Sequence, residues 1–150
     1  VQVPDYEADV CVAFAQGNIG KAVQLATSDS FNEIKNSALH LLKNVSKMEI
    51  NDIIATVKSV SEFKIDIQDY LDFLAVWYRD ILYFKATRDS NGLIFKDELN
   101  VITDQINKSS YEGIENILRG LQTAKTRLNA NVNFDLTMEL LFLLIKENLV

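Results

Sequence analysis

Few side chains in this sequence have the type and spacing that catalysis or metal binding requires. The single histidine, His40, has Asn36, Ser37, Lys43 and Asn44 at helical neighbour spacing. None of these is a carboxylate or thiolate that would complete a metal site. No Glu-x-x-His pair occurs, which argues against a di-iron bundle. We therefore expect His40 to lie on a solvated face, and we predict no metal ligand, no cofactor-binding residue and no catalytic residue.

The remaining reactive candidates have simpler structural explanations. Cys11 is the only cysteine and has no histidine nearby in sequence, so a buried structural thiol explains it better than a nucleophile. A single cysteine excludes an internal disulfide and fits a reducing cytoplasm. The acidic pairs Asp69/Asp72 and Glu112/Glu115 would suit acid–base chemistry. Carboxylates near helix starts are, however, favoured by the helix dipole, so we interpret these pairs as structural.

Motifs and charge both argue against nucleotide or nucleic-acid binding by this stretch. Neither GxxxxGK[ST] nor GxGxxG occurs, so no loop is expected to cradle a phosphate. The 15 Lys+Arg and 21 Asp+Glu give a net charge of −6, whereas affinity for DNA depends on neutralising its phosphates. We expect no binding of ATP, ADP or DNA.

The elements that carry these residues are predicted to be helices. The chain has 150 residues, 48% of them hydrophobic, with five glycines and one proline at position 4. Apolar residues recur with the period of a helix. The pattern predicts an all-α protein with a small helical piece up to residue 28 and a bundle of about six helices. Helices are expected over 6–16, 19–27, 31–45, 50–60, 67–87, 99–106, 110–128 and 136–149.

Polar residues predict several of the helix boundaries. Ser30 and Ser109 are each followed three residues later by a glutamate, which is typical of a capping box. Asp66 and Asn133 can cap the helices that follow them. Residues 88–92 predict a turn, and the three apolar residues after it predict a short extended stretch.

The apolar stripes predict which side chains form the core. Trp77 lies mid-stripe on the helix over 67–87, so it is expected in the core, with Asp80 on its polar flank and Arg79 partly buried. Residues 136–149 are apolar almost all round, which is typical of a buried central helix. The helix over 50–60 is expected to bury Ile50, Ile53, Ile54, Val57 and Val60.

Three stretches resemble a known family in their order and spacing. They are Gly17-Asn18-Ile19-Gly20-Lys21-Ala22, then Trp77-Tyr78-Arg79-Asp80-Ile81-Leu82, then Asn131-Val132-Asn133 followed by Glu139. The first is similar to the sensor-2 segment of an AAA+ lid, and the second to the Arg-Asp-x-Leu helix of the domain that follows the lid. The third is similar to the last two helices of that domain. The family is that of the clamp-loader subunits of bacterial DNA polymerase III.

The resemblance implies a division of the chain and a role. Residues 1–28 would be the C-terminal part of the lid, and residues 29–150 a helical collar domain. The motif residues of the collar would be structural: Trp77, Arg79, Asp80, Asn131, Asn133 and Glu139. Because the sequence begins with Val, we expect a fragment whose cytoplasmic parent belongs to the DNA polymerase III holoenzyme, a DNA-directed DNA polymerase.

The same resemblance implies partners and no chemistry for the fragment itself. The collar would assemble with the other clamp-loader subunits, tau/gamma and delta. Contacts with the sliding clamp and with primed DNA would arise only through the whole complex. No contact with a membrane is expected.

One departure from the family pattern favours a particular branch. An ATP-binding loader subunit carries an arginine in the sensor-2 segment, a planar, always-charged donor that reaches the nucleotide phosphate. The aligned position here is Gly20, and Lys21 would point about 100° away around the helix. The segment, Gly17, Asn18, Gly20 and Lys21, is therefore degenerate, which favours the delta prime branch over the ATP-hydrolysing tau/gamma branch.

Two alternatives stay open. The chain is the C-terminal part of a tau/gamma subunit, or it is an unrelated helical module that binds a peptide or small ligand in a groove between helices. A collar domain should expose a moderate apolar patch at its side and recruit other loader subunits. Alone, it should be a monomer or a weak dimer.

Overall fold

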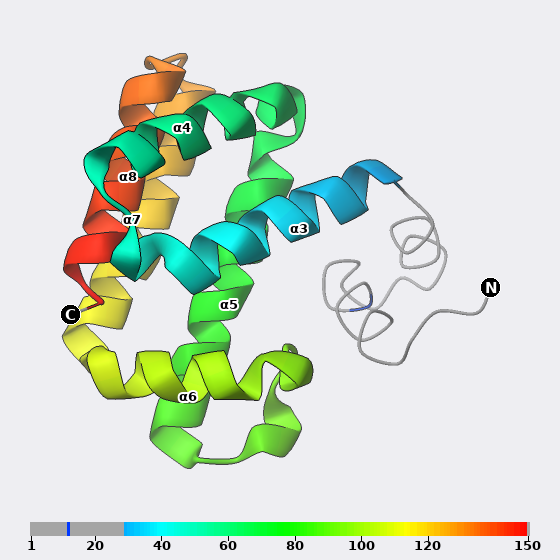
Figure 1. Cartoon of the computed structure of the whole chain (residues 1–150), viewed down its shortest axis with the longest axis vertical. Coiled ribbons are helices and arrows are strands. Elements are labelled where there is room, and N and C mark those ends of the chain that lie inside the picture. Colours follow the sequence, from blue (N-terminus) through cyan, green and yellow to red (C-terminus); the bar gives the residue numbers. More distant parts are fainter. Residues whose placement is uncertain (1–11, 13–28, 150) are drawn as a thin grey trace.

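The computed structural model describes Val12 and residues 29–149 (Figure 1). Apart from Val12, the helices expected over 6–16 and 19–27 lie outside the described residues. So do Cys11 and the sensor-2-like residues Gly17, Asn18, Gly20 and Lys21. The predicted boundary between residues 28 and 29 stays a prediction.

The described part of the chain contains six α-helices and no strand, which confirms the all-α bundle. The helices are α3 (Asp29–Asn44), α4 (Ile50–Val60), α5 (Ile67–Thr87), α6 (Leu99–Lys108), α7 (Tyr111–Asn129) and α8 (Phe134–Glu147). Short 3₁₀ turns join several of them: Val45–Lys47, Ser61–Asp66, Ser90–Gly92 and Lys96–Glu98. None of these helices is long and apolar enough to cross a membrane.

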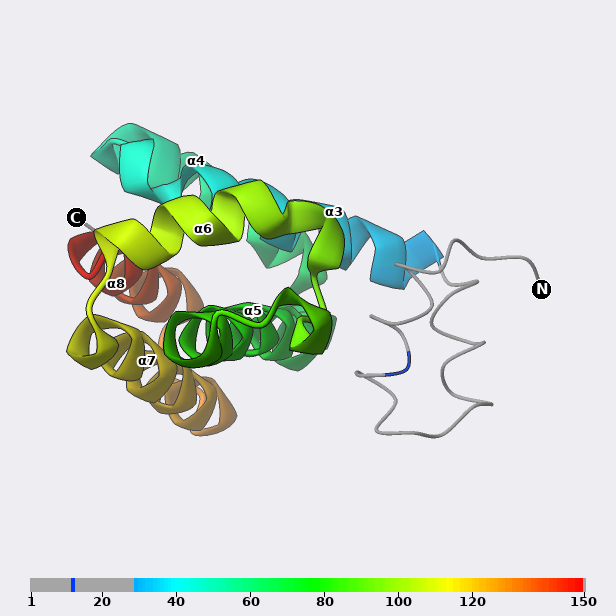
Figure 2. The ribbon, with the colours of Figure 1, turned by 90° about the horizontal axis from the view of Figure 1, so that it is seen from below.

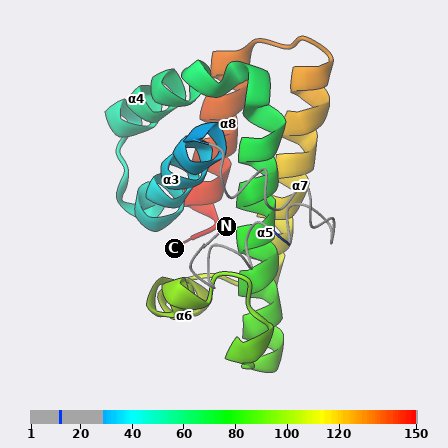
Figure 3. The same ribbon diagram turned by 90° about the vertical axis from the view of Figure 1, so that its right-hand side faces the viewer.

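The helices form two layers. Helices α5, α7 and α8 make one layer, and α3, α4 and α6 are laid across it (Figure 2). Within the first layer α7 packs against both α5 and α8, while α3 and α6 cross α5, and α4 packs on α8 (Figure 3). Helix α5 is therefore covered by three neighbours, which explains why its apolar face is so wide.

The predicted stripes form the core, with exceptions on α4 and α8. The stripe of α3 is buried as expected, with Ala38 and Leu41 fully enclosed. On α4, Ile53 is buried, but Ile50 and Ile54 are 56% and 48% exposed. The expectation for these two residues was wrong because α8 is the α-helix that chiefly covers α4, and one such neighbour hides a narrower arc than the five residues occupy.

The interpretation of the last helix was also wrong in part. Phe142 and Ile145 of α8 are fully buried, but Leu136 and Leu140 are 52% and 47% exposed. Helix α8 lies at the edge of its layer, with α7 on one side and α4 on another (Figure 3). An all-apolar surface on an edge helix leaves an uncovered apolar strip.

Three of the four predicted caps differ from the structure. Asn133 caps α8 as expected, because its side chain accepts a hydrogen bond from Leu136 N at 2.9 Å. Asp66 stands at the N-cap of α5 but makes no side-chain capping bond. Helix α3 already begins at Asp29, so Ser30 lies inside it.

The fourth cap is displaced by one residue. The N-cap of α7 is Ser110, whose Oγ accepts from Gly113 N at 2.9 Å. Ser109, the residue expected from its spacing to Glu112, instead ends α6 and donates its hydroxyl to Gln105 O at 2.7 Å. Both serines are of a type that favours an N-cap, but only Ser109 has a glutamate three residues later, and the cap nevertheless forms at Ser110.

The displaced cap predicts unequal effects of two neighbouring mutations. Ser110→Ala should lower the free energy of unfolding by about 1 kcal/mol, because an N-terminal amide of α7 loses its acceptor. Ser109→Ala should lower the free energy of unfolding by less, because the group that loses its bond is the Gln105 carbonyl, which lies within helix α6. Urea unfolding of both variants measures the difference, and a larger loss for Ser109→Ala would place the cap at Ser109.

Candidate interaction surface

Two of the motif residues named above meet around one aromatic ring. Trp77 and Asp80 of α5 both contact Phe95, which follows the turn after that helix. The Trp77 and Phe95 ring centroids are 5.3 Å apart, and Phe95 N donates to Asp80 Oδ2 at 2.9 Å. The ring of Phe73 lies 5.0 Å from that of Phe95. This junction fixes the connection between α5 and α6.

Trp77 also joins three helices through a buried polar link. Its side chain is fully buried, as the sequence predicted. The indole Nε1 donates to Gln105 Oε1 of α6 at 3.0 Å, and Gln105 Nε2 donates to Leu42 O at 2.7 Å. Leu42 lies in the last turn of α3, where carbonyls lack helical partners. The link therefore satisfies every polar group it buries.

Asp80 is a buried connector, which corrects the prediction of a polar flank. Its side chain is only 4% exposed, and its Oδ2 accepts from Ile94 N and Phe95 N, both at 2.9 Å. Burial raises the pKa of the Asp80 carboxyl to about 6, against the opposing effect of these two amide bonds. The carboxyl supplies acceptors to a short non-helical segment that begins at the extended residue Leu93.

Arg79 takes the opposite place from the one expected. Its side chain is exposed rather than partly buried. It follows Tyr78 and precedes Asp80, which both point inward, so the helical turn directs Arg79 to solvent. Arg79 is therefore a surface residue of α5.

The other three motif residues lie at the turn between α7 and α8. Asn131 adopts a left-handed backbone with φ of 59°, a conformation that asparagine tolerates better than most residues. Its N–H donates to Leu128 O at 3.1 Å, and Asn133 caps α8. Glu139 is half-buried one turn further along α8. Asn131 and Asn133 shape the helical hairpin, and the three residues do not form a chemical site with Trp77 and Asp80.

His40 lies where the sequence placed it. It is exposed on α3, and its neighbour Asn44 donates through Nδ2 to His40 O at 2.8 Å. Across residue 12 and residues 29–149, no three His, Cys, Asp or Glu side chains are grouped to hold a metal ion.

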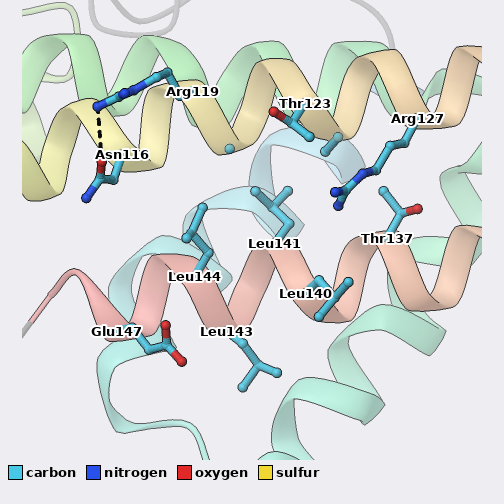
Figure 4. Close-up of a pocket in the computed structure, with 12 residues that line it drawn as sticks. Asn116, Arg119, Thr123, Arg127, Thr137, Leu140, Leu141, Leu143, Leu144 and Glu147 are labelled. Atoms are coloured by element: carbon cyan, nitrogen blue, oxygen red, sulfur yellow. Dashed lines mark hydrogen bonds between the residues drawn. The ribbon is translucent and has the colours of Figure 1, made fainter.

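A groove lies between α7 and α8. It has a volume of about 580 Å³, and Figure 4 looks into it. Leu140, Leu141 and Leu144 of α8 line its middle (Figure 4). A Cβ added to Gly120 of α7 would overlap the Leu144 side chain, so the absence of a side chain there lets Leu144 pack directly against α7.

Polar residues mark the two ends of this groove. Arg127 and Thr123 of α7 lie at one end, beside Thr137 of α8 (Figure 4). At the other end, Arg119 donates to Asn116 Oδ1 at 3.1 Å. The arrangement is an apolar floor between two guanidinium groups, with the carboxylate of Glu147 on the Asn116 side (Figure 4). Sequence periodicity missed it because it treated α8 as covered on every side.

Comparison with known proteins assigns the family. Residues 38–147 match the family described as "DNA polymerase III, delta subunit, C terminal". This range runs from the middle of α3 to the last residue of α8 and covers well over half of the chain. The chain belongs to this family.

The family assignment agrees with the resemblance found in the sequence. The chain is similar to a curated protein, the DNA polymerase III subunit delta' of Bacillus subtilis (strain 168). The two are 26% identical over 133 residues, which is 87% of this chain and 40% of the relative. The chain therefore spans less than half of the length of that protein. No solved structure matches the chain.

Proposed function

We propose that residues 29–150 form the collar domain of a bacterial clamp-loader subunit and hold that subunit to its neighbours. The observation that carries the proposal is the family match, which covers the bundle almost from end to end. The uncovered apolar strip on α8, with Leu136 and Leu140, supports it because exposed apolar patches of this kind mark interaction sites.

We further propose that the subunit is of the delta prime type. The curated relative carries that name, and Gly20 stands where an ATP-binding subunit would need an arginine. In this proposal residues 1–28 are the end of the AAA+ lid. The chain's own residues supply assembly contacts and no chemistry, and the sliding clamp and DNA are reached through the whole complex.

Reconstitution with purified subunits tests the assembly role. The chain should elute with the tau/gamma and delta subunits in size-exclusion chromatography, whereas alone it should elute as a monomer or weak dimer. The C-terminal part of tau/gamma provides a competitor: an excess of it should not displace this chain if the two occupy different places in the ring.

Two results would contradict the proposal. Elution of the chain apart from the loader subunits at every concentration tested would remove the assembly role and favour an independent helical module. Complete displacement by the tau/gamma fragment would keep the collar role but assign the chain to the tau/gamma branch.

A further inference from the structure

We propose that the α7–α8 groove is the docking site for an amphipathic helix of a neighbouring clamp-loader subunit, with acidic side chains of that helix held by Arg127 and Arg119. The proposal rests on the assembly role proposed above and adds the surface and the chemistry of the partner. Its experiment is designed so that the groove can fail while the assembly role stands.

The shape of the groove suits a helix. Two packed helices with a depression between them accept the apolar ridge of a third helix. The floor is made by Leu140, Leu141 and Leu144 (Figure 4), and Leu136 extends the apolar strip by one turn of α8. The groove volume of about 580 Å³ is large enough for several apolar side chains from one face of a helix.

Two arginines and one carboxylate, Glu147, line the groove, so its net positive charge favours an acidic partner. Among the described residues, Arg127 has no carboxylate within ion-pair distance, and Arg119 bonds only to the neutral amide of Asn116. By contrast, Lys125 on the same helix is already paired with Asp72 of α5. The two guanidinium groups lie eight residues, or about two turns, apart on α7. A helix with carboxylates spaced by two turns would match both.

An unpartnered hydroxyl lies at the Arg127 end of the groove. Thr137 is buried, and its Oγ1 has no hydrogen-bond partner in the described part of the chain. A buried polar group without a partner is unfavourable. Arg127 extends toward Thr137 in Figure 4. When a partner carboxylate draws the guanidinium to itself, the same carboxylate can accept from the Thr137 hydroxyl.

Matched pairs of variants test the groove in the full chain. Arg127→Glu reverses one charge in the groove, and Arg79→Glu makes the same change on the exposed face of α5. Leu140→Asp and Ile54→Asp place a charge at two apolar positions of equal exposure, 47% in the groove and 48% on α4. The readout is the dissociation constant for the cognate tau/gamma and delta subunits, with a thermal melt of each variant to confirm folding.

The groove variants should each weaken association by about tenfold or more, and the two control variants should bind as the unaltered chain does. For Arg127→Glu the loss should shrink at high salt, because the contact is electrostatic. Equal binding by all four variants would overturn the groove proposal while the assembly role stands. If the unaltered chain binds neither subunit, the assembly role itself fails. Should Leu140→Asp unfold, the comparison of Arg127→Glu with Arg79→Glu decides alone.

Discussion

Trp77→Ala is expected to lower the free energy of unfolding by about 3–5 kcal/mol. The indole is fully buried, so its removal leaves a large cavity between α5 and the Phe95 segment. It also leaves Gln105 Oε1 without its donor, which adds the cost of an unsatisfied buried acceptor. Urea unfolding followed by far-UV circular dichroism measures the loss.

A conservative variant separates the two contributions. Trp77→Phe keeps most of the apolar volume but removes the indole N–H. Its free energy of unfolding should therefore lie between those of the wild type and Trp77→Ala. A loss of less than about 1 kcal/mol for Trp77→Ala would contradict the buried position of this side chain.

Asp80→Ala is expected to be the second most destabilising change, at about 2–4 kcal/mol. The carboxyl accepts from two backbone amides of the segment after α5, and the Phe95 amide is buried. Alanine leaves both amides without an acceptor and releases the segment that presents Phe95 to Trp77. Asp80→Asn is the matched control, because its amide oxygen can accept both bonds without a charge. At pH 7, Asp80→Asn should unfold at nearly the wild-type denaturant concentration.

The Asp80 pair of variants also predicts a pH dependence. The pKa of the Asp80 carboxyl is raised in the folded state from 3.8 to about 6, so the folded protein holds this proton more tightly than the unfolded chain does. Between pH 4 and pH 6 the unfolded chain loses the proton first, and the contribution of Asp80 to stability falls as pH rises. Above the folded-state pKa the contribution is constant.

The difference in stability between wild type and Asp80→Asn isolates this effect from the other carboxyl groups. The free energy of unfolding of the wild type should exceed that of Asp80→Asn by more at pH 4 than at pH 7. A difference that is flat across this range, or that changes in the opposite direction, would contradict the raised pKa.

The sequence predicted long helices well where several independent signals agreed. Helix α5 was expected over 67–87 and is found at Ile67–Thr87. Its apolar stripe is long, and the polar turn after it is unambiguous. The turn is entered by Arg88 with a φ of 57°, a left-handed residue that ends a helix sharply. The burial of Trp77 followed from the same stripe.

Features that depend on neighbouring elements were not predictable in this way. Periodicity assigned Asp80 to a polar flank because it ranks side chains by polarity, and it contains no information on which backbone amides lack acceptors. The capping-box spacing pointed to Ser109, whereas the cap forms at Ser110, whose residue three positions later is Gly113. The apolar pattern predicts that Leu140 is buried, but no other helix packs over it in the described part of the chain, and it is 47% exposed. The groove, like these three residues, is defined by how the helices pack.

The position of α8 has a consequence for the order in which the chain folds. Lys146 at its end donates to Met48 O, before the start of α4, across a separation of 98 residues. Ile53 and Val57 of α4 are buried, and α8 is the α-helix against which α4 packs most extensively. During synthesis at the ribosome, α4 therefore emerges long before α8, and until α8 is made the apolar face of α4 is exposed to water. Such contacts between residues far apart in sequence slow folding and expose a nascent chain to aggregation. The first half of the bundle therefore completes its core only when α8, the last helix to be synthesised, packs against it.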